Sequence, residues 1–150
     1  MKVAVLGVGS LGKELARIYA ELAAIGGVEF AGVCDVVVET ARRIAARYRV
    51  RAFNSLAEAA DTTDAFSIAT PTTTHYQLAK ALLSQGKHLL LEKPMTDNAA
   101  QAAELVRLSQ QHRCVLQVGH VERFNPVFKY LESVATEPRF IETHRLSPYP

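Results

Sequence analysis

Short apolar runs alternate along the chain with longer segments in which apolar residues recur every three or four positions. The runs cover residues 2–6, 28–34, 50–53, 65–69, 87–91 and 114–118. Runs of this length, bounded by turn residues, predict strands, and the segments between them predict helices. Strands that alternate with helices predict an α/β fold, a Rossmann-type doubly wound parallel sheet with helices on both faces.

Capping residues mark the expected starts of three helices. Ser55 precedes the helical segment LAEAA, Thr74 and Gln77 have the spacing of a capping box, and Thr96 precedes a helix that runs to about residue 112. Each hydroxyl can accept a hydrogen bond from a free amide of the first helical turn. The polar pattern therefore predicts where these helices begin.

Composition and charge narrow the class of protein. The 150 residues are 49% hydrophobic and 21% charged, with a formal net charge of +2, which favours a globular domain over a disordered chain. The charge is too small to indicate nucleic acid or a membrane surface as partner, and the arginines of residues 42–51 fit a solvated helix face. No apolar stretch is long enough to span a bilayer, and the glycine-broken N-terminus does not fit a signal peptide.

The two cysteines add a prediction about location. Cys34 and Cys114 lie far apart in apolar segments, with neither disulfide-like nor metal-like spacing. Reduced thiols in a cytoplasmic protein that holds no metal are the simplest interpretation.

The sequence GVGSLG, residues 7–12, carries glycines in the G-x-G-x-x-G spacing directly after a predicted strand. Gly7 would permit a tight turn, Gly9 a close approach of a pyrophosphate, and Gly12 close packing of helix and strand. The free amides at the helix start, where Ser10 and Leu11 lie, would face the phosphates. Alone, such a turn can also serve packing only.

Asp35 strengthens the case for a dinucleotide. An acid at the end of the second strand can bind both hydroxyls of an adenosine ribose. Val36 and Val37 follow where an arginine would hold a 2′-phosphate, so NAD is favoured over NADP. Two alternatives stay open: Asp35 as the cap of the next helix, and Arg42 or Arg43 folding back to bind NADP.

The segments ATPTTTH, residues 69–75, and LLLEKPMT, residues 89–96, close two further strands with polar residues. The first suits a loop that touches a cofactor, with His75 at a helix start contacting either the cofactor or only the backbone. Its alternative is turn and cap chemistry alone. Both segments would lie at the carboxyl edge of the sheet, where such folds bind ligands.

In the second segment, Pro94 favours an extended backbone at Lys93, which projects Glu92 and Lys93 in opposite directions. We therefore expect no simple salt bridge between them. A desolvated amine beside a nicotinamide could hydrogen-bond the alcohol being oxidised and accept its proton. The alternative is a surface lysine at a strand end.

The segment VGHVERFNP, residues 118–126, follows the sixth strand with several polar groups. Such a loop could line a substrate pocket, with Arg123 and Asn125 as candidate contacts. Its alternative is a helix cap flanked by charges, in which Asn125 caps a helix that starts at Pro126 and runs to about residue 134.

Taken in this order, GVGSLG, Asp35, ATPTTTH, LLLEKPMT and VGHVERFNP resemble the Gfo/Idh/MocA oxidoreductases, relatives of glucose–fructose oxidoreductase and inositol 2-dehydrogenase. The resemblance implies NAD(P)-dependent oxidation or reduction of a sugar or cyclitol hydroxyl. It implies a catalytic Lys93, Glu92 near the nicotinamide ribose, and Pro94 completing the motif. It also implies a loop beside the cofactor made by Ala69, Thr70, Pro71 and His75.

The segments ERFNP and RLSPYP look most like the branch that oxidises the 3-hydroxyl of UDP-N-acetylamino sugars. The resemblance covers only the N-terminal half of the family. The other half is an α/β domain that covers the active site, supplies a catalytic aspartate and histidine, and mediates homo-oligomers.

We therefore expect residues 1–124 to form an NAD-binding domain, and residues 125–150 a linking helix and the first strand of a truncated second domain. Residues 140–146 would be a strand without partners, which favours association. This chain alone should bind NAD and catalyse poorly.

Two other functions remain as alternatives. A non-catalytic module that senses NAD with a partner chain would need the glycines and Asp35 but no lysine beside the nicotinamide. A methyltransferase would bind another adenosine cofactor and ignore NAD.

Overall fold

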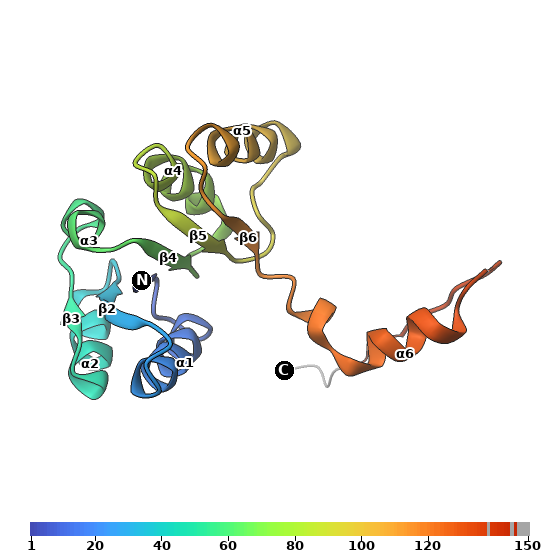
Figure 1. The fold of residues 1–150 in the computed structure, drawn as a ribbon, viewed down its shortest axis with the longest axis horizontal. Coiled ribbons are helices and arrows are strands. Elements are labelled where there is room, and N and C mark those ends of the chain that lie inside the picture. Colours follow the sequence, from blue (N-terminus) through green and yellow to red (C-terminus); the bar gives the residue numbers. More distant parts are fainter. Residues whose placement is uncertain (138, 145, 147–150) are drawn as a thin grey trace. The chain divides into compact units, whose positions relative to one another are not determined.

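The computed structural model describes residues 1–137, 139–144 and 146. Its centre is a six-stranded sheet in the order β3-β2-β1-β4-β5-β6, in which every paired strand is parallel to its neighbour (Figure 1). The strands are β1 (Lys2–Leu6), β2 (Glu29–Cys34), β3 (Arg51–Ala52), β4 (Ala65–Ile68), β5 (His88–Leu91) and β6 (Leu116–Val118). This confirms the predicted doubly wound sheet, with strand order reversing at β1, between β2 and β4.

Helices cover both faces of the sheet (Figure 1). They are α1 (Gly12–Ala24), α2 (Val38–Tyr48), α3 (Leu56–Thr62), α4 (Thr72–Leu83) and α5 (Ala99–Gln111). Two separate groups of buried apolar side chains follow from this arrangement. One includes Ala16 of α1 and Ile44 of α2, and the other includes Leu82 of α4 and Leu105 of α5. Both faces of the sheet are buried, which explains why the strands are continuously apolar rather than alternating.

Among the caps predicted for the helices that cover the sheet, the structure confirms one and corrects two. Ser55 Oγ accepts a hydrogen bond from Glu58 N (3.1 Å) at the start of α3. The capping box of Thr74 with Gln77 is wrong, because α4 begins at Thr72 and both residues lie inside the helix. β4 ends at Ile68, which leaves Pro71 as the N-cap residue, and its φ of −59° suits the entry into a helix.

The cap of α5 lies two residues beyond the predicted position. Asn98 Oδ1 accepts a hydrogen bond from Gln101 N (3.0 Å), whereas Thr96 Oγ1 donates to the Asn98 carbonyl oxygen (2.8 Å). Asparagine is a better N-cap than threonine, so the helix uses the stronger cap of the two.

The chain divides into two compact units, Met1–Gly119 and His120–Pro150. Within the second, a 3-10 helix η1 (Val121–Phe124) leads to α6 (Pro126–Val134). Asn125 caps α6 as predicted, its Oδ1 accepting from Val127 N (3.0 Å). Among the described residues of this unit none is buried. The predicted domain boundary at residue 124 falls inside this unit, after η1.

The strand expected over residues 140–146 is not formed at residues 140–144, and Arg145 lies outside the described residues. A strand exists by hydrogen bonding to a neighbour, and no described strand pairs with this segment. Across the described part of the chain, no helix combines the length and apolar composition needed to cross a membrane.

Candidate functional site

The turn after β1 is built from glycines with different structural needs. Gly7 has φ +79°, and a Cβ atom there would lie 2.8 Å from the Ala69 carbonyl oxygen. A Cβ on Gly12 would lie 1.8 Å from the Gly7 carbonyl oxygen, whereas one on Gly9 would meet nothing within 4 Å. Gly7 and Gly12 are therefore required by the packing of this chain, while Gly9 borders open space.

The backbone at this turn offers free donors to that space. No described residue accepts a hydrogen bond from the amides of Gly9, Ser10 or Leu11. The first amides of a helix have no partner within the helix, and with the helix dipole they form a site for anions. The turn into α1 thus has the geometry to bind a pyrophosphate.

Asp35, directly after β2, organises two turns at once. Its Oδ2 accepts a hydrogen bond from Val8 N (2.7 Å), and its Oδ1 accepts one from Val37 N (2.8 Å). The second bond is local turn chemistry just before α2. The alternative in which Asp35 caps the next helix is wrong, because the N-cap residue of α2 is Val37, with no side-chain cap bond. Each carboxylate oxygen has a further lone pair, so these bonds leave acceptors for a diol.

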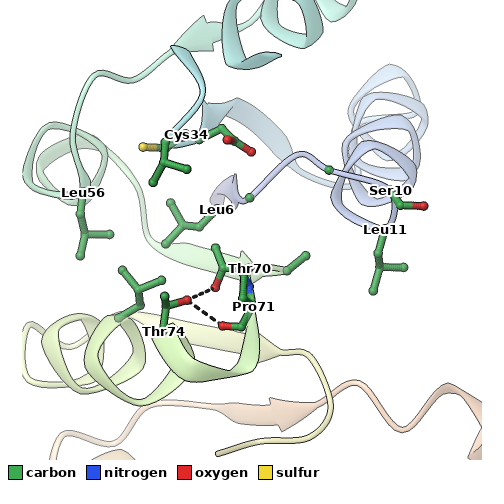
Figure 2. A pocket seen from close by; sticks show the side chains of 14 residues that line it. Leu6, Ser10, Leu11, Cys34, Leu56, Thr70, Pro71 and Thr74 are labelled. Carbon is green, nitrogen blue, oxygen red and sulfur yellow. Dashed lines mark hydrogen bonds between the residues drawn. The ribbon is translucent and has the colours of Figure 1, made fainter. Parts of the chain in front are cut away.

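A cavity of about 640 Å³ lies between these turns and the end of β4 (Figure 2). It unites eight predicted site residues: Gly7, Gly9, Ser10, Leu11, Asp35, Ala69, Thr70 and Pro71. Its size is typical of cofactor and ligand pockets. In Figure 2, Ser10 and Leu11 lie at the start of α1, and Thr74 binds Thr70 and Pro71 on the opposite wall.

Sequence reasoning missed six residues of this cavity. They are Leu6, Cys34, Val36, Leu56, Thr74 and Leu78. Most are apolar, as the walls around an aromatic base would be. One signal was available, because Leu6 and Cys34 end the two strands that precede the glycine turn and Asp35. Leu56 lies in α3 and Leu78 in α4, and only the folded chain shows that both side chains reach the cavity.

Cys34 is the one thiol on the cavity wall. Burial, then the nearby charges of Asp35 and Glu58, raise the pKa of this thiol. The side chain therefore stays neutral and acts as part of the apolar wall.

The turn after β5 separates Glu92 from Lys93. The Glu92 side chain is 7% exposed, whereas Lys93 is exposed. The described ion pairs do not include one between them, and the shortest bond recorded is from Lys93 N to Glu92 Oε2 (3.3 Å). The absence of a described salt bridge agrees with the expectation, and one side chain is buried while the other is exposed. The desolvation of Lys93 beside a nicotinamide stays a prediction.

Gly119, the residue after β6, closes over the buried carboxylate of Glu92. A Cβ on Gly119 would lie 2.7 Å from Glu92 Oε1 and 2.8 Å from Oε2. Any larger residue would displace the carboxylate. Sequence analysis missed this role, since nothing local distinguishes Gly119 from a glycine in an ordinary turn.

Four further predicted cofactor contacts do not line the cavity: His75, Glu92, Lys93 and Pro94. The His75 ring is 1% exposed, and its nitrogens face the carbonyl oxygens of Thr70 (Nε2, 2.9 Å) and Pro94 (Nδ1, 3.0 Å). Of the two predictions for His75, contact with the cofactor and contact with the backbone, the structure shows the second. Gly12 likewise lies behind the cavity wall, where it allows α1 to approach Gly7.

Arg123 and Asn125 belong to the second unit. Asn125 has a structural partner at both ends of its amide, since its Nδ2 also donates to Glu122 Oε2 (2.9 Å). Arg123 is exposed in η1. Their predicted place in a substrate pocket stays a prediction. In the part of the chain that the structure describes, no cluster of His, Cys, Asp or Glu could hold a metal ion.

Comparisons with known proteins agree with this geometry. A family model described as "Oxidoreductase family, NAD-binding Rossmann fold" matches residues 1–120. The chain is 38% identical to UDP-N-acetylglucosamine 3-dehydrogenase of Acidithiobacillus ferrooxidans over 150 residues, 99% of this chain and 46% of that protein. It is 34% identical to inositol 2-dehydrogenase of Rhodococcus jostii over 145 residues, 93% of this chain and 39% of that protein.

Comparison with solved structures also finds dehydrogenases of this kind. UDP-N-acetylglucosamine 3-dehydrogenase of A. ferrooxidans superimposes with a TM-score of 0.83, covering 90% of this chain and 43% of that one. GenD2 from gentamicin A biosynthesis, in complex with NAD, superimposes with a TM-score of 0.83 at 28% identity, covering 91% of this chain and 39% of that one. The chain spans less than half the length of each of these proteins.

Proposed function

The chain belongs to the Gfo/Idh/MocA family of oxidoreductases, and on that premise we propose that it is the NAD-binding part of a dehydrogenase acting on a nucleotide sugar. The observation that carries the proposal is one cavity lined both by the glycine turn, whose amides have no described acceptor, and by Asp35 after β2. One end suits a pyrophosphate and the other the diol of a ribose.

We propose NAD rather than NADP as the cofactor. Asp35 lies where the adenosine ribose would bind, and its negative charge would repel a 2′-phosphate. Val36, which follows it on the cavity wall, is 99% exposed and offers no cation. Of Arg42 and Arg43, the two residues that could fold back to bind NADP, Arg42 is engaged with Glu39 (2.9 Å). Each of these facts favours a free 2′-hydroxyl.

We propose that Lys93 is the catalytic group and that Glu92 lies near the nicotinamide ribose. Both follow β5, at the same edge of the sheet as the cavity. A bound NAD would supply the hydride acceptor. In the oxidation, hydride leaves the carbon that bears the hydroxyl, and the hydroxyl proton passes to the Lys93 amine. The exposed position of Lys93 leaves its side chain free to meet a substrate.

The substrate we propose is a UDP-N-acetylamino sugar oxidised at its 3-hydroxyl. This rests on the likeness over the full chain to UDP-N-acetylglucosamine 3-dehydrogenase. Inositol 2-dehydrogenases are also similar, so a cyclitol is the second class to assay. Because the relatives are more than twice as long, we expect turnover from a full-length protein of this kind and little from this chain alone.

The cofactor proposal is tested by titrating the chain calorimetrically with NADH and NADPH. We expect NADH to bind at least tenfold more tightly, because each well-placed charged hydrogen bond contributes roughly 1.5–3 kcal/mol. Asp35→Ala should weaken NADH and narrow the preference, while Asp61→Ala, an exposed acid of α3, serves as the matched control. Equal affinity for the two cofactors in the unmodified chain would contradict the choice of NAD.

The role of Lys93 separates the enzyme from the NAD-sensing module. In a full-length protein, Lys93→Ala should reduce kcat by at least a hundredfold while NADH affinity changes little, since general acid–base groups contribute roughly 10²–10⁴ in rate. If turnover of UDP-N-acetylglucosamine persists unchanged, the module that senses NAD becomes the better description.

A further inference from the structure

His75 and Glu92 are the two buried ionisable side chains among the described residues, and the proposed reaction does not use His75. His75 lies in the first turns of α4 and is 1% exposed. A buried imidazole needs hydrogen-bond partners for its nitrogens. The identity of those partners gives the residue its significance.

Both partners are backbone carbonyls in loops of the site. Nε2 lies 2.9 Å from the Thr70 carbonyl oxygen, and Nδ1 lies 3.0 Å from the Pro94 carbonyl oxygen. Thr70 lines the cavity, and Pro94 directly follows Lys93. Both partners are acceptors, so the ring donates a hydrogen bond through each nitrogen that carries a proton and only contacts the other carbonyl. The ring thus lies between the loop after β4 and the turn after β5, and His75 and Pro94 are 19 positions apart in the sequence.

The turn is anchored on either side of Lys93, because Glu92 N donates to the Ile68 carbonyl oxygen (3.0 Å) and Met95 packs against the core, but it has few anchors at Lys93 itself. The side chains of Lys93 and Pro94 are exposed, and the nearest recorded bond within the turn is the long one from Lys93 N to Glu92 Oε2 (3.3 Å). An exposed turn with few bonds samples many conformations unless something holds it. The His75 ring is a rigid donor that approaches this turn from a helix.

We propose that His75 is a positioning residue: it ties the Lys93–Pro94 turn to the cofactor loop and so sets where the Lys93 amine stands relative to a bound cofactor. The part of this inference that concerns catalysis by Lys93 rests on the proposed function. The link that His75 makes between the two loops does not, and it can be tested without any ligand.

Two conservative variants separate the two bonds of the ring. The amide nitrogen of asparagine takes the place of Nδ1, which faces Pro94, and that of glutamine takes the place of Nε2, which faces Thr70. His75→Asn should therefore retain the tether to the Lys93 turn, and His75→Gln the tether to the loop after β4. His75→Leu retains neither bond.

The measurement is amide hydrogen exchange of the full chain, segment by segment. In His75→Leu we expect exchange to rise about tenfold in residues 69–74 and 92–98, since one hydrogen bond is worth roughly 0.5–1.5 kcal/mol. His75→Asn should restore protection in 92–98 alone, and His75→Gln in 69–74 alone. Helix α5 is the internal control. If His75→Leu does not fold, the Asn and Gln variants still decide the question.

Two results would overturn the tether: unchanged exchange in both segments of His75→Leu, or a uniform rise that includes α5 with no selective restoration by Asn or Gln. A uniform rise would make His75 an ordinary packing residue.

NAD⁺ titration of the same proteins tests the proposed function separately. We expect His75→Leu and His75→Asn to bind NAD⁺ several-fold more weakly than His75→Gln, which retains the bond to the loop that lines the cavity. Failure of the unmodified chain to bind NAD⁺ would refute the cofactor proposal and leave the exchange result standing.

Discussion

The two halves of the sheet edge differ in how completely the chain builds them. At the end formed by β1 and β2, Asp35 bonds both neighbouring turns, and glycines fit against backbone at distances that admit no Cβ. At the end formed by β5, Lys93 is exposed and its turn is held by His75 and a few local contacts. Under the proposed function, the first end would hold the adenosine half of the cofactor and can be rigid. The second would have to admit a substrate, which an open turn allows.

The largest effect should come from adding one methyl group to the rigid end. Gly12→Ala would place a Cβ atom 1.8 Å from the Gly7 carbonyl oxygen, so α1 or the glycine turn must shift. We expect this shift to lower the free energy of unfolding by about 3 kcal/mol or more. Gly9→Ala is the matched control and should cost little stability, because a Cβ there meets nothing. Urea denaturation of both variants measures this, and equal losses would break the contrast.

Gly9→Ala should nevertheless weaken NADH binding, since its methyl group would occupy space beside the free amides. The pair thus separates stability from binding at the same turn. Unchanged NADH affinity in Gly9→Ala would mean that the pyrophosphate does not lie against this residue.

A smaller effect is expected at the open end from Gly119→Ala. Its Cβ would lie 2.7 Å from Glu92 Oε1, and we expect a loss of about 1 kcal/mol in the free energy of unfolding, because the atoms that must move are the far end of a side chain and not backbone. Glu92→Ala removes the obstacle, so the double variant should lose less than the sum of the two single losses. Strict additivity would show that Gly119 and Glu92 are not coupled.

Cys34 reports on the rigid end through its chemistry. Because burial and negative neighbours raise the pKa of this thiol, the unfolded chain loses the proton first as pH rises. Alkylation by iodoacetamide should therefore be slower in the folded chain than in the chain unfolded by urea. As pH increases, the rate in the folded chain should keep rising after the rate in urea has levelled off. Stability should correspondingly fall on the alkaline side.

NADH should slow alkylation at Cys34, which lines the cavity, but not at Cys114, which does not line it. The pKa of the Cys114 thiol is also raised by burial, so the two thiols are comparable. Cys114 is thus the internal control. Equal protection of both thiols would indicate a general stabilisation instead of cover by the cofactor.

The smallest effect on stability should be that of Lys93→Ala. The side chain is exposed, and no described ion pair holds it, so the midpoint of thermal unfolding should stay within the error of the unmodified chain. Scanning calorimetry at neutral pH measures this. A marked loss would mean that Lys93 has a structural partner and would weaken its assignment to catalysis.

Much of this structure was predictable because its determinants are local. Strand periodicity, the glycine spacing and the acid after β2 act over a few residues each, and the sheet and the cavity floor follow from them. The cavity walls at Leu56 and Leu78, the cover of Glu92 by Gly119 and the bonds of His75 depend on residues brought together by the whole fold. The missed caps at Asn98 and Pro71 are a different case. At α5 two residue types that can cap lie close together, and the stronger one is used; at α4 the helix begins at Thr72, before the threonine predicted to cap it.

The double engagement of Asp35 bears on any attempt to redesign cofactor choice. Exchanging this acid for a small neutral residue, the obvious route to an NADP-dependent variant, would also strip the acceptor from the amides of Val8 and Val37. Such a variant would have a less rigid glycine turn as well as the intended preference for NADP. A successful variant would have to furnish those amides with another oxygen, such as that of a serine or asparagine, before introducing a cation for the phosphate.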